Sequence, residues 1–107
     1  MSKSTVQLEE YSRYCFFCGT PNMNGEHHFI FGSGNRQKAE EDGIKANVCN
    51  RCHTMGAVIE RVHDNPMAEM LSKMFGQAIY ERNEAAKGAT IYEAREKFRK
   101  RYGQCYY

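Results

Sequence analysis

Two pairs of cysteines, each with the spacing Cys-x-x-Cys, constrain this chain more than any other feature. The first pair is Cys15 and Cys18, and the second is Cys49 and Cys52. Each pair supplies two thiolates from one tight turn, and four thiolates complete the tetrahedral coordination of a structural zinc ion. We therefore predict a small finger whose two ends are fastened together by one zinc ion.

Two other interpretations of the cysteines are less favoured. A redox-active Cys-x-x-Cys needs only one pair and a strand-to-helix context that is absent here. Cys49 to His53 also matches the haem-attachment pattern Cys-x-x-Cys-His, but that chemistry belongs to exported proteins and the chain shows no export signal. Cys105 has no partner at a metal-binding spacing and is expected to be a free thiol.

Length and composition indicate one small domain. The chain has 107 residues, and a core of that size gains much from a structural metal. We predict a flexible arm over residues 1–13 and a single domain over 14–107. No apolar run is long enough for a secretory signal or a membrane span, so we expect a cytoplasmic protein with no membrane partner. In that reducing compartment, paired cysteines favour zinc over disulfides.

Local patterns predict a mixed α+β fold. Residues 26–31 and 44–48 are typical of short strands, and residues 36–42 are typical of a helix that Gly43 ends. A helix is expected from Cys49 onward. Asn65-Pro66 begins a helix predicted to reach about residue 86, and Thr90 with Glu93 predicts a capping box for a last helix over about 90–102.

Four histidines lie among the cysteines, at positions 27, 28, 53 and 63. The cysteines alone fill a zinc site, so the histidines are left for a second task, and imidazole serves both as metal ligand and as general base. Adjacent residues of a strand point to opposite faces, so His27 and His28 cannot both bind one ion from a regular strand. One could bind the ion while the other faces a substrate.

His53 and His63 are harder to bring together. Ten residues of continuous helix would separate them by about 15 Å. They can share an ion only if the chain breaks between them, and Gly56 permits such a break without requiring one. The alternative is that His63 merely flanks the start of the helix at Asn65.

The combined pattern resembles the HNH endonucleases with the ββα-metal (treble-clef-like) fold, and is similar to small HNH-like proteins of bacteriophages and prophages. The resemblance covers roughly residues 15–82 and rests on the order of ligand types together with several local runs. These are His27 to Gly32, Gly34 to Arg36, Gly43, Cys49 to His53, Val62-His63 and Gln77 to Glu81. Ile44 stands roughly where that family carries its middle Asn.

The resemblance implies a mechanism and a set of roles. A divalent cation (Mg²⁺, Mn²⁺, Ni²⁺ or Zn²⁺) would be held by His27, His53 and His63, apart from the structural zinc. His28, or else His27, would activate the water that attacks a DNA phosphodiester, in a bacterial host cell. Arg36 would contact phosphate.

Basic residues near the C-terminus form a second candidate contact with DNA. Arg95, Arg99, Lys100 and Arg101 lie on one predicted helix, although such a face is more often solvated surface. The main alternative function is a non-catalytic zinc-finger module that binds DNA or a host protein. A third hypothesis is a structural homodimer joined through the Met- and Phe-rich helix.

Overall fold

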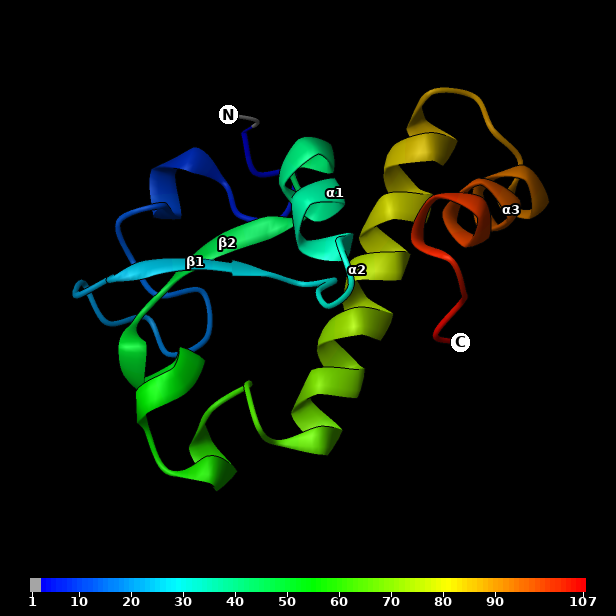
Figure 1. The fold of residues 1–107 in the computed structure, drawn as a ribbon. Helices are drawn as coiled ribbons and strands as arrows, with labels where there is room; N and C mark the ends of the chain where they lie inside the picture. The colour runs from blue at the N-terminus through cyan, green and yellow to red at the C-terminus, as the bar shows by residue number, and fades with distance from the viewer. Residues whose placement is uncertain (1–2) are drawn as a thin grey trace.

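The computed structural model describes residues 3–107 and shows a mixed α+β fold (Figure 1). A two-stranded sheet is flanked by helices, and short 3₁₀ and π turns connect the elements. In chain order the main elements are β1 (Gly25–His28), α1 (Asn35–Asp42), β2 (Lys45–Val48), α2 (Pro66–Ala86) and α3 (Ile91–Tyr102).

The sheet is an antiparallel hairpin whose register fixes the direction of the histidines. Gly25 lies opposite Val48 and His28 lies opposite Lys45. Since successive strand residues face opposite sides, His27 and His28 are directed to different faces of the hairpin.

Helix α1 ends where the sequence predicted. Gly43 adopts a φ of +72°, and a Cβ at this position would lie 2.3 Å from the carbonyl oxygen of Lys3. The Thr5 amide donates to the Gly43 carbonyl at 2.7 Å. Residues 3–7, which the sequence placed in a flexible arm, are thus hydrogen-bonded to the loop between α1 and β2.

The two C-terminal helices follow the predicted ranges because their start signals operate as expected. The Asn65 side chain accepts a hydrogen bond from the Ala68 amide, and Pro66 occupies the first turn. Thr90 and Glu93 form a complete capping box. In Figure 1, α3 packs beside the C-terminal half of α2, on the side away from the strands.

The core joins the hairpin to both helices. Helix α2 approaches the segment after β1 closely at Gly76, where a Cβ would lie 2.6 Å from Ile30 Cγ1. The buried apolar residues of this main core are Phe29, Ile30, Ala39, Ile44, Ala46, Ile79, Phe98 and Tyr102. They come from β2, from the segments that adjoin the two strands and from the three α-helices, so packing holds β1 and its His27 in place.

One predicted element differs in form. The helix expected from Cys49 is a five-residue π turn, Arg51–Met55, that ends at Gly56. A full third element of a ββα unit is therefore absent from this stretch, and the chain turns back instead. Within residues 3–107, the longest helices carry too many charges to cross a lipid bilayer.

Candidate metal centres

The four paired cysteines form one cluster, as their spacing predicted. One sulfur atom from each of them lies within 4.8 Å of every other, and three of the four side chains are buried. Cys18 Sγ lies 3.7 Å from Cys49 Sγ. A tetrahedral ion with metal–sulfur bonds of about 2.3 Å needs sulfurs about 3.8 Å apart, so this cluster could hold a metal ion such as zinc.

The surroundings of the sulfurs favour a bound cation. The Thr20 amide lowers the pKa of Cys18 from 9.0 to about 6. Burial instead raises the pKa of Cys52, and the neighbouring sulfurs add to the increase. Without a cation, four thiolates this close cannot all be charged, whereas a divalent ion stabilises them together.

Three histidines form a second cluster beside the first. Nitrogen atoms of His27, His53 and His63 lie within 4.8 Å of one another, so this group too could hold a metal ion. The rings of His27 and His53 pack edge to face with centroids 5.3 Å apart, and those of His53 and His63 are tilted with centroids 4.7 Å apart. The histidines come from β1, from the π turn and from the segment before α2.

The chain reversal at Gly56 makes this convergence possible. The Val62 amide donates to the Cys52 carbonyl at 2.8 Å, and the His63 amide donates to the His53 carbonyl at 3.1 Å. The returning segment is thereby paired with the turn that carries Cys52 and His53. The sequence identified Gly56 as the position for a break, and the structure places the reversal there.

His27 is the most constrained of the three. Its side chain is completely buried, and its Nε2 lies 2.8 Å from Ser72 Oγ. The Ser72 hydroxyl donates to the Phe29 carbonyl at 3.0 Å, so its oxygen accepts the proton on His27 Nε2. This leaves Nδ1 of His27 unprotonated, and Nδ1 is the one buried side-chain nitrogen or oxygen in residues 3–107 without a hydrogen-bond partner.

An orphaned, deprotonated imidazole nitrogen beside two other imidazoles fits a metal ligand. A ligating histidine typically donates its other N–H to a fixed acceptor, as His27 does to Ser72. Burial, reinforced by the neighbouring histidines, lowers the pKa of His27 to about 3, so the ring stays neutral at neutral pH.

The other two rings, His53 and His63, also lie beside groups that affect their charge and orientation. Burial lowers the pKa of His53, with additional effects of His63, His28 and the guanidinium of Arg36. Glu69, in the first turn of α2, lies 3.7 Å from His63 Nδ1 and accepts a hydrogen bond from the Asp64 amide. Ser72 and Glu69 were not predicted as site residues. The one sequence signal for Ser72 was a serine within the apolar stripe of α2, and Glu69 had none.

His28 does not join this cluster. Its Nε2 lies 2.8 Å from Glu40 Oε1. Glu26, His28 and Glu40 are also close enough to surround a cation, but the buried ammonium group of Lys45 lies there, 2.6 Å from Glu40 and 3.2 Å from Glu26. Lys45 therefore supplies the positive charge at this position as part of a salt-bridge network.

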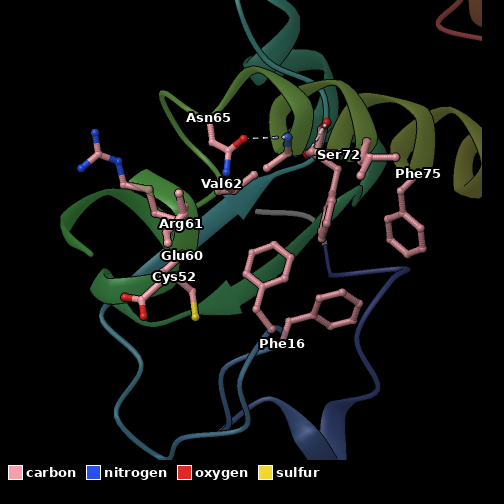
Figure 2. Close-up of a pocket in the computed structure, with 13 residues that line it drawn as sticks. Phe16, Cys52, Glu60, Arg61, Val62, Asn65, Ser72 and Phe75 are labelled. Carbon is pink, nitrogen blue, oxygen red and sulfur yellow. Dashed lines mark hydrogen bonds between the residues drawn. The ribbon is translucent and has the colours of Figure 1, made fainter. Parts of the chain in front are cut away.

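An apolar groove is lined in part by Ser72, the hydrogen-bond partner of His27. The groove has a volume of about 440 Å³. Figure 2 shows Phe16, Phe75, Val62 and Cys52 around it, with Arg61 and Glu60 toward one end. Ile59 on its border is 89% exposed. The groove separates the cysteine finger from the N-terminal half of α2.

Most of the predicted basic residues are neutralised by partners. Arg95 pairs with Glu81, Arg99 with Glu96, and Arg101 with Glu41 and Asp42. Within residues 3–107, Arg36 and Lys100 take part in no ion pair, and both are exposed. They are the predicted phosphate contacts whose charge is not already balanced.

Comparisons with known proteins give no relative: no family model, no curated protein and no solved structure matches this chain.

Proposed function

We propose that this protein is a metal-dependent endonuclease of the HNH type, which hydrolyses phosphodiester bonds in DNA and comes from a bacteriophage or prophage. The observation that carries the proposal is the convergence of His27, His53 and His63 from three separate segments. A three-histidine site leaves coordination positions open for water and substrate, as catalytic sites require, whereas a four-cysteine site is closed. The sequence resemblance provides the reaction class.

The two centres have separate roles in this proposal. Cys15, Cys18, Cys49 and Cys52 hold a structural zinc ion that fixes the turn carrying His53. His27, His53 and His63 hold a divalent cation, which supplies charge stabilisation for the phosphate and its leaving oxygen. Ser72 fixes the tautomer of His27, and Arg36 contributes positive charge near His53.

We assign the general base to His28, which lies outside the three-histidine cluster but close enough to help lower the pKa of His27 and His53. Glu40 accepts from Nε2, so in the neutral ring Nδ1 carries the lone pair that can take a proton from water. His27 is less suited to that task, since Ser72 occupies its Nε2 and the ring belongs to the cluster proposed to hold the cation. Glu40 is therefore a positioning residue, which orients His28 and balances Lys45.

A plasmid nicking assay tests the proposal. Zinc-loaded protein is incubated with supercoiled plasmid and Mg²⁺, Mn²⁺ or Ni²⁺. Cleavage is expected to require the added cation, to disappear in His53→Ala, and to fall at least 100-fold in His28→Ala. Thr54→Ala, an exposed neighbour of His53, serves as the control and should cleave like wild type.

Intact plasmid with every cation, from protein that retains its fold and zinc, would overturn the nuclease proposal. The zinc-finger binding module would then be the preferred hypothesis. The observation that favours it is the apolar groove of Figure 2, because exposed apolar surfaces of this kind mark interaction sites.

A further inference from the structure

A basic cleft adjoins the histidine cluster and is not part of it. It has a volume of about 450 Å³ and lies between the loop before α1, the middle of α2 and the end of α3. Four of its lining residues are lysine or arginine, and none of the described lining residues is aspartate or glutamate. Such a one-sided charge distribution favours an anionic ligand.

The charges in this cleft are partly free. Lys38 donates to the Arg101 carbonyl at 2.8 Å, and Arg101 is paired with Glu41 and Asp42. Lys73 and Lys100, in contrast, form none of the ion pairs found in residues 3–107. Two ammonium groups from different helices therefore face one cleft without a neutralising carboxylate.

Aromatic rings connect the cleft to the histidines. The Lys73 ammonium lies 4.7 Å from the centre of the Phe31 ring and 5.7 Å from that of Tyr106. The Phe31 ring also contacts the His63 ring, with centroids 4.8 Å apart. Phe31 is thus a shared wall: a strand bound in the cleft would continue directly to the histidine cluster.

The backbone of the cleft leaves room for a phosphate. Gly32, Ser33 and Gly34 are consecutive residues with positive φ, and they lead into the N-terminus of α1. Nothing lies within 4 Å of where a Cβ of Gly32 or Gly34 would be.

Side chains of α1 hold one side of the cleft to α3. The Asn35 side chain donates to the Tyr102 carbonyl at 3.3 Å and, with Lys38, connects α1 to the end of α3.

We infer that this cleft binds the sugar–phosphate backbone of a nucleic-acid strand, next to the phosphodiester that reacts at the histidine cluster. Lys73 and Lys100 contact its phosphates, and Phe31 and Tyr106 provide aromatic surface for a base or sugar. This rests on the proposed function for the identity of the reacting bond. If the cleft binds the strand, the main DNA contact is the cleft and not the exposed face of α3 that the sequence suggested.

Binding is measured by fluorescence anisotropy with zinc-loaded protein and no other divalent cation. The probes are a labelled 16-nucleotide single strand, a hairpin duplex and the single strand with a neutral methylphosphonate backbone. At about 0.15 M salt, each lost phosphate contact should weaken binding about four- to five-fold. Lys73→Gln/Lys100→Gln should therefore bind about 20-fold more weakly, with a salt slope reduced by about 0.7 to 0.9 per lysine.

Matched variants separate the cleft from general charge. Lys87→Gln removes the same charge from the exposed end of α2 and should change affinity less than two-fold. Lys73→Arg/Lys100→Arg should restore binding, and the thermal midpoint of each variant reports folding. Inorganic tripolyphosphate should compete only at much higher concentration than the single strand, since it contacts the lysines but not the rings.

Four results would overturn the inference: no binding of either charged probe by wild type; equal binding of the neutral-backbone probe; equal losses in Lys87→Gln and the double variant; or tripolyphosphate competing as well as the strand. The nicking assay distinguishes failure of the nuclease proposal from failure of the cleft inference. Cleft-dependent binding without cleavage would support the cleft inference and contradict the nuclease proposal. Cleavage with unchanged binding in the double variant would support the nuclease proposal and contradict the cleft inference.

Discussion

The chemistry of the histidine cluster depends on which nitrogen of His27 carries the proton. Ser72 settles this because its own proton goes to the Phe29 carbonyl. A buried helix residue thereby determines the ligand atom that a strand residue presents.

Replacing Ser72 with alanine should therefore weaken the binding of a cation by the histidine cluster without unfolding the protein. The free His27 ring could then adopt the other tautomer, and the expected loss of affinity for Ni²⁺ or Mn²⁺ is about 10- to 100-fold. Calorimetric titration of zinc-loaded protein measures it, and Ser33→Ala is the control. Unchanged cation affinity in Ser72→Ala would show that the hydrogen bond does not select the ligand atom.

Glu40 gives a prediction about pH. Hydrogen bonds from Lys45 and His28 lower its pKa from 4.5 to about 2. Since the folded-state pKa is depressed, the stabilisation is complete above the unfolded-state value and is lost as pH falls from about 4.5 to about 2. Glu40→Gln should cost about 1–3 kcal/mol at pH 7 by leaving the buried Lys45 with one carboxylate.

The measurement is the difference in unfolding free energy between wild type and Glu40→Gln, because loss of metal in acid affects both proteins. This difference should be constant from pH 7 to about 5 and shrink below that. Glu10→Gln, at an exposed position, should match wild type throughout. A difference that stayed constant down to pH 3 would contradict the assigned role of Glu40.

The elements differ in how well the sequence anticipated them. Helices α2 and α3 were predictable because their caps are local: Asn65-Pro66 and the Thr90–Glu93 box act within one turn. The π turn at Arg51–Met55 was not, since helical propensity there is overridden by tertiary pairing of residues 62 and 63 with residues 52 and 53. The cysteine cluster followed from spacing, whereas the contacts of Ser72 with His27 and Phe29, and of Phe31 with His63, join residues more than 30 positions apart.

Gly56 should be intolerant of any side chain, because a Cβ there would lie 2.3 Å from the Arg51 carbonyl oxygen. Gly56→Ala is expected to displace the returning segment that carries His63. The cost should be about 1–3 kcal/mol of stability, with loss of the second metal. Denaturant unfolding and metal titration test both parts, with Gly25→Ala, where the space is open, as the control. A Gly56→Ala protein that bound two metals normally would contradict the importance of this reversal.

Under the proposed function, the molecule combines a closed metal site with an open one, and the two should respond differently to metal removal. The sulfur cluster connects the turn after Tyr14 to the end of β2, so an ion held there would contribute to folding. His27 lies on β1 opposite the core residue Ala46, and backbone hydrogen bonds pair the segments of His53 and His63 with each other, so a cation held by the histidines should contribute less.

Metal removal should therefore proceed in two stages. Mild chelation is expected to remove the cation from the histidines, abolishing nicking while the circular dichroism spectrum and thermal midpoint change little. Titration with a thiol-reactive mercurial should then release about one zinc per chain, with loss of cooperative unfolding. Cys49→Ser should reproduce only the loss of the thiol-bound zinc. His53→Ala should reproduce only the loss of the histidine-bound cation. If mild chelation unfolded the protein, or if His53→Ala lost the thiol-bound zinc, the two centres would be one structural unit and the division of roles between cysteines and histidines would be wrong.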